Sequence, residues 1–483
     1  MSLTWETIPL LPLRCILEHL SMEDAVAAMS TCRHWRNAIG LYEGYKDPLT
    51  LNAKQLDKNL FLTRIFRKYT RTLHIYLDGT EAELEKFMKL VLTQYFDTAK
   101  LQEIMFIGPR YIEQSFHVPL VKLKRILTES LVFKHQHSIK KLAFMGCNIG
   151  TMQHESERYA HKNLEYYARP LKFSCVQTPE DSILSSANMH LMQKSAFTHL
   201  VVDYEQINTA SLETLSHLPN FRKLSLNITN KRQTLTPVDW YHLDDFYKQP
   251  LQVTVNIIAV PYRRLDYVMR NVLVEGLTLV SLKVMFCQSL YAPLLNHVSR
   301  VYQITLREVL WADSPYDSND PYHRVVRPLR SPQPDTAHVN PFVLLCWQCV
   351  NLERLVIHGY WVWQYDLLGF VRLRKGLSHL EVSAIYNRQD RFTSALQMSD
   401  EGVVRVLCGD SPAAIDAGYV KEINQYMEFK WKPTLWSKLH PALRGRSTAE
   451  QRADYVVKEA RKPLGYISVN RPGIGQNRVV WVE

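Results

Sequence analysis

The hexapeptide "LVSLKV" (279–284) shows the pattern that decides the fold, because the same pattern recurs along most of the chain. An apolar residue is followed by two variable residues, a leucine or similar residue, one variable residue and a last apolar residue. In an extended chain the last two apolar residues point to the same side. One strand cannot bury that side alone, so the pattern predicts strands that stack side by side.

The strong copies of this pattern are "LQEIMF" (101–106), "IKKLAF" (139–144), "FTHLVV" (197–202), "FRKLSL" (221–226), "LVSLKV" (279–284), "VYQITL" (301–306), "LERLVI" (352–357) and "LSHLEV" (377–382). The weaker copies are "RTLHIYL" (71–77), "PLKFSCV" (170–176) and "LQVTVNI" (251–257). Their central residues, which we take as anchors, are Leu73, Ile104, Leu142, Leu171, Leu200, Leu224, Val253, Leu282, Ile304, Leu355 and Leu380. Most anchors are spaced near the roughly 20–29 residues of a leucine-rich repeat, or slightly further apart.

Helical patterns lie between the anchors, at 81–96, 209–218 and 263–273. Strands that alternate with helices are typical of a parallel sheet. We therefore predict the α/β class, with an irregular leucine-rich-repeat solenoid of parallel strands and helices over residues 46–386. An ordinary α/β domain with leucine-rich parallel strands is the alternative, and the repeated hexapeptide favours the solenoid.

Two segments fall outside the repeat. The Pro- and Asp-rich stretch at about 312–340 reads as a loop insertion. Residues 387–483 form a basic, aromatic tail with a predicted helix at 448–462. A terminal repeat needs its open apolar face covered, so this tail is predicted to cap the array. Its aromatic residues Trp431, Trp436 and Trp481 could instead contribute to binding.

The composition bounds the partners and the compartment. The 483 residues carry a net charge of +11, which fits either a polyanionic partner or a diffusely basic surface. No Lys/Arg run is dense enough for a nucleic-acid arm, so we expect no nucleic-acid partner. The eight cysteines lie mostly in apolar segments, as expected of buried thiols in a reducing compartment. Without a signal-peptide pattern or a long apolar stretch, we expect a cytoplasmic or nuclear protein with no membrane partner.

The sequence offers no convincing active site. Cys346 and Cys349 form a C-x-x-C pair, but no second pair follows at zinc spacing, and His358 lies inside a predicted strand. Two buried cysteines on a helix are the simpler interpretation. The "GDSPAAIDAG" (409–418) and "GIGQNR" (473–478) stretches lack the spacing of a nucleophile or dinucleotide loop. We expect no enzyme activity, no metal site and no cofactor.

The first 45 residues carry the most specific motif. Two or three short amphipathic helices are predicted there, and apolar residues recur on one helical face. The ordered set resembles an F-box. The residues that carry the resemblance are Ile8, Pro9, Leu13, Ile16, Leu17, Leu20, Asp24, Cys32 and Trp35. Pro12, Ala25 and Thr31 depart from the family pattern. The alternative is an unrelated helical hairpin packed on the array.

The resemblance implies that residues 1–45 dock on a Skp-family adaptor, which links to a cullin–RING ubiquitin ligase. F-box domains joined to leucine-rich repeats also form a known architecture of substrate receptors in SCF complexes. The chain is therefore expected to recruit an unknown protein substrate to an SCF-type ligase. The alternative function is a leucine-rich-repeat scaffold that does not assemble an active ligase.

Two sets of site residues follow from this interpretation. The residues implied to bind the adaptor are Ile8, Pro9, Leu13, Ile16, Leu17, Leu20, Val26 and Met29. Trp35 is expected in the core of the module rather than at its surface. The residues expected on the concave, substrate-binding face of the array are Tyr76, Met105, Ile107, Met145, Asp203, Asn227, Lys283, Arg307 and His358.

Overall fold

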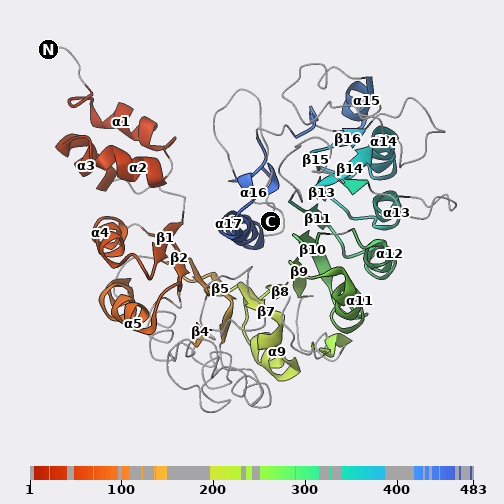
Figure 1. The fold of residues 1–483 in the computed structure, drawn as a ribbon, viewed down its shortest axis with the longest axis horizontal. Helices are drawn as coiled ribbons and strands as arrows, with labels where there is room; N and C mark the ends of the chain where they lie inside the picture. Colours follow the sequence, from red (N-terminus) through yellow and green to blue (C-terminus); the bar gives the residue numbers. More distant parts are fainter. Residues whose placement is uncertain are drawn as a thin grey trace. The chain divides into compact units, whose positions relative to one another are not determined.

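The computed structural model describes residues 5–20, 22–40, 48–68, 70–95, 101–108, 121–122, 135, 137–148, 196–229, 235, 237–241, 251–288, 290–314, 327–328, 340–386, 418–427, 430–434, 438–444, 447–462, 467–468 and 479–480. The chain divides into two compact units. Unit 1 comprises residues 1–111 and 117–223, and unit 2 comprises residues 112–116 and 224–483. Figure 1 shows the ribbon with its elements labelled.

Unit 1 begins with three short helices, as the N-terminal pattern predicts. They are α1 (Leu10–Leu17), α2 (Met22–Met29) and α3 (Arg33–Gly40). Pro9 is the N-cap of α1, and Pro12 lies in its first turn. The first turn of a helix has no intrahelical partners for its N–H groups, so proline costs little there.

The rest of unit 1 alternates strands with helices. Its long strands are β1 (Leu49–Asn52), β2 (Thr72–Tyr76), β3 (Glu103–Ile107), β5 (Lys141–Met145) and β7 (His199–Asp203), all parallel and neighbours in chain order. Leu73, Ile104, Leu142 and Leu200 stand opposite one another across these strands. The described helices of this part are α4 (Leu56–Phe66), α5 (Glu81–Leu90) and α9 (Thr209–Ser216), with 3₁₀ turns at Leu92–Tyr95 and Tyr204–Gln206.

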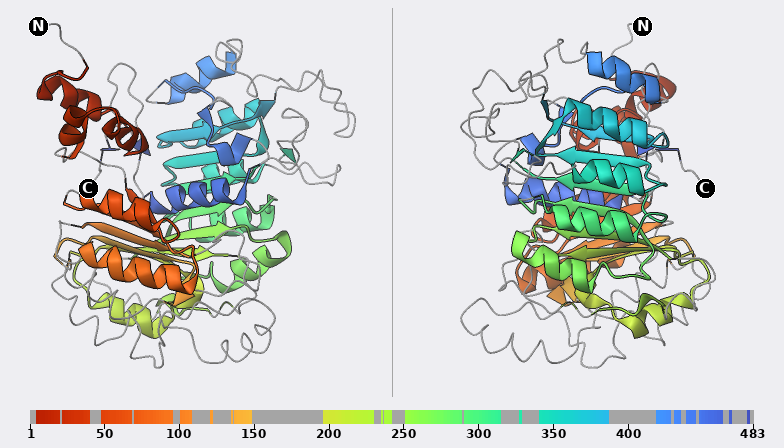
Figure 2. Two further views of the ribbon diagram at one scale, coloured as in Figure 1. Left: turned by 60° about the vertical axis from the view of Figure 1, so that its left-hand side comes forward. Right: turned by 90° about the vertical axis from the view of Figure 1, so that its right-hand side faces the viewer.

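Unit 2 repeats the same architecture. Its strands are β8 (Lys223–Ile228), β9 (Gln252–Ile258), β10 (Leu279–Met285), β11 (Glu308–Ala312), β13 (Arg354–His358) and β15 (His379–Val382), again neighbours in chain order. The helices that follow them are α11 (Tyr262–Asn271), α12 (Ala292–Val301), α13 (Pro341–Gln348) and α14 (Gln364–Leu373). Figure 2 shows these four helices stacked along one side of the unit. Each helix covers the apolar side of its strand, as the repeat predicts.

One anchor predicted from the sequence is wrong, and a second lies in its strand but out of register with its neighbour. Ile304 is exposed and belongs to the turn after α12, whereas Val309 of β11 stands opposite Leu282. The apolar residues at 301–306 come from the end of a helix and the turn after it, a spacing that imitates the strand pattern. Val255, rather than Val253, stands opposite Leu282, because the register between β9 and β10 shifts beside Leu279 and Ser281. Such irregularities depend on pairing and leave no mark in a single repeat.

Different helices pack on the two faces of the unit 2 sheet. Trp311 packs edge-on against Phe342 of α13, with ring centroids 6.3 Å apart, on what we call the outer face. Lys283 points the other way, to the inner face, where its Nζ donates to the carbonyl of Glu459 at 2.7 Å. Glu459 belongs to α17 (Ala449–Arg461), the helix predicted at 448–462, so part of the C-terminal tail lies on the inner face (Figure 1).

Another part of the tail lies along the last strand of unit 2. The amide of Thr434 donates to the carbonyl of Val382 in β15 at 3.1 Å, and the buried Trp431 indole donates to the carbonyl of Leu380 at 2.8 Å. These bonds occupy polar groups that an edge strand would otherwise expose. The neighbouring helices are α15 (Gly418–Tyr426) and α16 (Pro441–Arg444).

Short strands complete the described elements. They are β4 (Val121–Lys122) with β6 (Cys147–Asn148), then β12 (Arg327–Pro328), β14 (Tyr360–Trp363) and β16 (Ile385–Tyr386) together, and β17 (Ile467–Ser468) with β18 (Val479–Val480). The Leu171 anchor, Trp436, Trp481 and most of the predicted 312–340 insertion lie outside the described residues. In the described part of the chain, the helices are too short or too polar to cross a bilayer.

Candidate functional site

The three N-terminal helices share a small core of their own. Leu13 and Leu17 from α1 are buried together with Met29 from α2 and Ile39 from α3. Ala25 and Ala38, also buried, let the helices approach closely. Ala25 is one of the departures from the family pattern, and its small side chain adds little volume to this core.

The extended segment before α1 is fastened to α3. The indole N–H of Trp35 donates to the carbonyl of Trp5 at 2.8 Å. The His34 Nε2 lies 2.8 Å from the carbonyl of Ile8. Trp35 is half-buried rather than in the core expected for it, although its N–H bonds within the module. These two bonds set the direction in which the chain enters α1.

Large apolar side chains are left exposed around this entry. The exposed fraction is 71% for Trp5 and 76% for Leu11. Leu10 is exposed too, and so are the prolines at 9 and 12. Large exposed apolar patches mark protein interaction sites, so these side chains are candidates for an interface. We call Trp5, Leu10 and Leu11 the apolar entry surface.

The predicted adaptor contacts divide between core and surface. Leu13, Leu17 and Met29 are buried inside the module, whereas Pro9 is exposed. The remaining four, Ile8, Ile16, Leu20 and Val26, are half-buried. Adaptor contact at these residues stays a prediction. The motif does not single out Trp5 or Leu11. The available signal is that Leu11 is apolar but lies outside the buried stripe of α1.

A family model described as "F-box domain" matches residues 5–46. The N-terminal module is an F-box domain. The match covers the three helices and the segment that leads into them, so the family match and the geometry agree on this part of the chain.

Two curated relatives match over a stretch of similar length. F-box only protein 33 of Homo sapiens is 46% identical over 50 residues, which is 10% of this chain and 9% of the relative. F-box only protein 33 of Mus musculus is 48% identical over 40 residues, or 8% of this chain and 7% of the relative. The chain thus matches less than a tenth of either relative's length.

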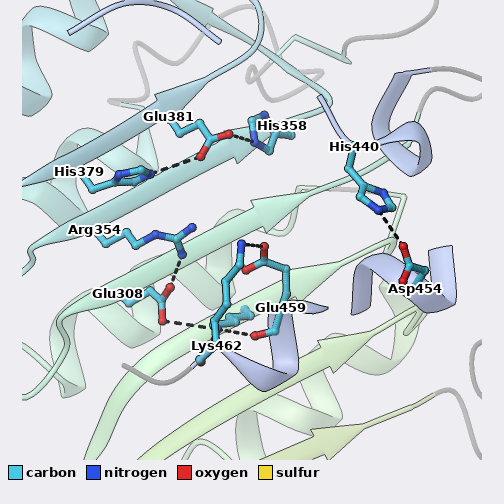
Figure 3. A network of polar contacts seen from close by, with 10 residues as sticks. Glu308, Arg354, His358, His379, Glu381, His440, Asp454, Glu459 and Lys462 are labelled. Atoms are coloured by element: carbon cyan, nitrogen blue, oxygen red, sulfur yellow. Dashed lines mark hydrogen bonds and ion pairs between the residues drawn. The ribbon is translucent and has the colours of Figure 1, made fainter. Parts of the chain in front are cut away.

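A second candidate site was predicted on the inner face of the sheet, and a buried ionic network occupies it in unit 2 (Figure 3). Glu308 of β11 pairs with Arg354 of β13 and lies 3.7 Å from the Nζ of Lys283. Its second oxygen accepts a bond from the hydroxyl of Ser281 at 2.6 Å. Glu459 of α17, which pairs with Lys462, adds a second buried carboxylate.

The pKa values of this network follow from burial and partner charges. Burial alone raises the pKa of Glu308, but the charges of Lys283 and Arg354 outweigh it and lower the pKa to about 2. Burial lowers the pKa of Lys283, and the nearby carboxylates oppose that effect. Removing one member would therefore leave a buried charge without its partner. The network fixes α17 on the sheet rather than offering free groups to a ligand.

Histidines extend the polar contacts along this face. His358 and His379 flank Glu381 of β15, with Nε2–Oε distances of 3.2 and 3.3 Å. Burial raises the pKa of Glu381, but bonds from the two histidines bring it well below its usual range. In the tail, His440 lies 3.0 Å from Asp454 of α17.

The structure gives the predicted substrate-binding residues very different surroundings. Met105, Ile107, Met145, Asp203, Asn227, Lys283 and His358 are buried, and Tyr76 is half-buried. Asp203 accepts a bond from the amide of Gly146 at 2.7 Å, and Asn227 accepts one from Asn256 at 2.8 Å. Arg307 is exposed, and it lies in the turn before β11 because the strand begins at Glu308. Arg307 is thus the one member of this set whose side chain is mainly in solvent. Substrate contact by any of these residues stays a prediction.

The C-x-x-C pair shows the burial expected of structural thiols. Cys346 of α13 and Cys349 at its C-cap are free and fully buried. Burial raises the pKa of the Cys349 thiol to about 12, so it stays protonated at neutral pH. Within the described ranges, no group of three His, Cys, Asp or Glu side chains is placed to hold a metal ion.

Proposed function

We propose that this chain is a substrate-recognition subunit of an SCF-type cullin–RING ubiquitin ligase. The F-box domain docks on the Skp-family adaptor, and the strand–helix array, which we take to be an irregular leucine-rich-repeat solenoid, binds a protein substrate. The observation that carries the proposal is the F-box match at residues 5–46 together with its apolar entry surface.

In this role the chain performs no chemistry of its own. It holds the substrate near a ubiquitin-loaded partner, so that transfer becomes effectively intramolecular. Such a role needs two surfaces on one chain, one for the ligase and one for the substrate. The free, buried cysteines support work in a reducing compartment, the cytoplasm or the nucleus.

The apolar entry surface is the part of the F-box domain to test first. Removing apolar area from water contributes about 25 cal/mol per Å², from which the entropy and desolvation costs of association are subtracted. Changing Leu10 and Leu11 together to Asp puts two charges where the adaptor would exclude water, and we expect binding to weaken at least about tenfold. Purified chain and Skp-family adaptor would be measured by isothermal titration calorimetry.

The control for this experiment is Asn37→Asp, which adds a negative charge at an exposed position of α3. It should leave adaptor affinity within about twofold of the original, since it changes no exposed apolar side chain. Leu13→Asp is unsuitable, because Leu13 lies in the core and the change would unfold the domain. Unchanged affinity of the double Leu10/Leu11 variant would show that the apolar entry surface does not bind the adaptor. If the original chain does not bind adaptor at all, the proposed function is wrong.

A scaffold that binds adaptor without forming a ligase is the alternative. Co-purification distinguishes the two functions. A ligase subunit brings down cullin and adaptor in equal amounts, whereas a scaffold brings down adaptor without cullin. Proximity labelling with the intact chain and with a chain lacking residues 1–40 would then identify substrates. Proteins that are labelled by both chains and become more abundant with the deletion are the expected substrates.

A further inference from the structure

Exposed apolar side chains gather where the outer helices of unit 2 end. Ile304 follows α12, Trp347 lies in the last turn of α13, and Val350 follows α13. Their exposed fractions are 73%, 63% and 54%. We call these three residues the apolar edge. Because more than half of each side chain is exposed, these three residues contribute little to the core.

The backbone holds the apolar edge in one arrangement. The amide of Val350 donates to the carbonyl of Gln303 at 3.0 Å, and the side chain of Asn351 donates to the carbonyl of Ile304 at 2.7 Å. These two bonds tie the turn after α12 to the turn after α13. Because the surface is fixed before any partner arrives, little ordering entropy is lost on binding.

Arg374 connects the end of α14 to these two turns. From the end of α14, its guanidinium donates to the carbonyls of Cys346, Trp347 and Val350, with distances of 2.9 Å to Cys346 and 3.3 Å to Trp347. It caps the last carbonyls of α13, where a positive charge also meets the negative end of the helix dipole. Arg374 is therefore a positioning residue for the apolar edge.

The exposed charges of the three turns at the apolar edge are mainly positive. Arg300, Arg307 and Lys375 are exposed beside the three turns. The stretches 300–307, 346–354 and 372–378 contain Glu353 as their one acidic residue. A partner that brings carboxylates would be attracted to this rim, and arginine binds carboxylates with directed, charge-assisted bonds.

We propose that the apolar edge, with Arg300, Arg307 and Lys375, is a docking surface for an acidic segment of a protein partner that also carries apolar side chains. Exposed Trp and Arg are the residue types that most often dominate such interfaces. The inference rests on the proposed function, because it takes this partner to be the substrate. In the described part of unit 2, α17 occupies the inner face, whereas the apolar edge is exposed.

Charge also selects among the possible occupants. A second copy of this chain would bring two basic rims together, and like charges oppose association. A purely apolar partner would leave the rim cations without counter-charges. An acidic segment with an apolar anchor satisfies both halves of the surface.

The test is a selection of random 12-residue peptides, displayed on phage, against the intact chain. We expect the recovered peptides to be rich in Asp and Glu around at least one large apolar residue. The best peptide, synthesised with a fluorescent label, would be titrated by fluorescence anisotropy. The paired change Ile304→Ser and Val350→Ser, and separately Arg307→Glu, should each weaken its binding at least about tenfold. Binding should also weaken as the salt concentration rises.

The matched control is Tyr262→Ser on α11, which removes another exposed aromatic side chain of unit 2. It should leave peptide affinity within about twofold. Recovery of basic or uncharged peptides, no recovery at all, or equal loss with Tyr262→Ser would overturn the proposed surface. So would concentration-dependent dimerisation that Ile304→Ser and Val350→Ser abolish, because the occupant would then be a second copy.

Failure here is distinguishable from failure of the proposed function. The selection uses the original chain and needs no adaptor. If the adaptor binds the F-box domain but no acidic peptide depends on the apolar edge, only the docking surface is wrong. If acidic peptides bind through the apolar edge but adaptor does not bind, the surface stands as a protein-binding site and the ligase role falls.

Discussion

Glu308 is the residue on which the buried ionic network of the inner face most depends. Its carboxylate meets Arg354, Lys283 and the hydroxyl of Ser281, and its side chain is almost fully buried. A buried ion pair adds little net stability over an apolar replacement, but breaking it costs about 3–5 kcal/mol. Glu308→Gln keeps the shape and removes the charge. We expect it to lower the free energy of unfolding of unit 2 by an amount of that order.

Urea-induced unfolding of the intact chain at pH 7, followed by hydrogen exchange in β10 and β11, would measure this loss. The matched control is Glu422→Gln, which removes a carboxylate paired with Arg372 at the surface. Solvent screens that pair, so little change is expected. Equal effects of the two substitutions would contradict the assignment of Glu308 to a desolvated network.

At the scale of elements, the sequence predicts strands better than it predicts what covers them. The hexapeptide places Leu282, Leu355 and Leu380 in register, because burial on one side of a strand leaves a period-two pattern. The helix at 448–462 is predictable from its periodicity and its Thr448 cap. The docking of this helix on β10 is not predictable, because Lys283 and Glu459 are far apart in sequence and each is typical of a surface charge.

The same limit applies to the F-box domain. The motif identifies the domain from spacing alone, but it does not separate the core residue Leu13 from the exposed Leu11. That division depends on how three helices cross, which spacing along one helix does not specify. The apolar edge was missed for a similar reason, because Ile304 fits the strand pattern and was assigned to a buried anchor.

The cap of α17 offers a prediction on the stability of one element. The Thr448 hydroxyl accepts a bond from the amide of Gln451 at 3.2 Å, and the Gln451 side chain accepts one from the amide of Thr448 at 3.0 Å. Removing such a cap costs about 1 kcal/mol. With Thr448→Ala we expect hydrogen exchange in α17 to become about fivefold faster, measured by mass spectrometry.

Thr80→Ala is the matched control, because Thr80 and Glu83 form the same capping box on α5. It should speed exchange in α5 and leave α17 unchanged. Faster exchange of α17 in both variants would mean that α17 responds to the stability of the whole chain rather than to its own cap.

At the scale of the whole molecule, the buried carboxylates predict sensitivity to acid. The pKa of Glu308 is about 2 in the folded chain, and its ordinary value is 4.5. A carboxyl whose pKa is lowered by folding stabilises the fold above its unfolded pKa, and the stabilisation is lost as the pH falls through the folded pKa. The pKa values of Glu381 and Glu459 are lowered too, so all three act in the same direction.

We therefore expect the free energy of unfolding to be steady above about pH 5 and to fall between about pH 4.5 and 2. Glu308 alone would account for about 3 kcal/mol of that fall, because each pKa unit corresponds to about 1.4 kcal/mol. Urea unfolding midpoints measured from pH 2 to pH 7 would give the profile. In Glu308→Gln the profile should lose that share, so the variant and the original chain should approach equal stability near pH 2. Parallel profiles over the whole range would show that Glu308 is not held ionised by Lys283 and Arg354.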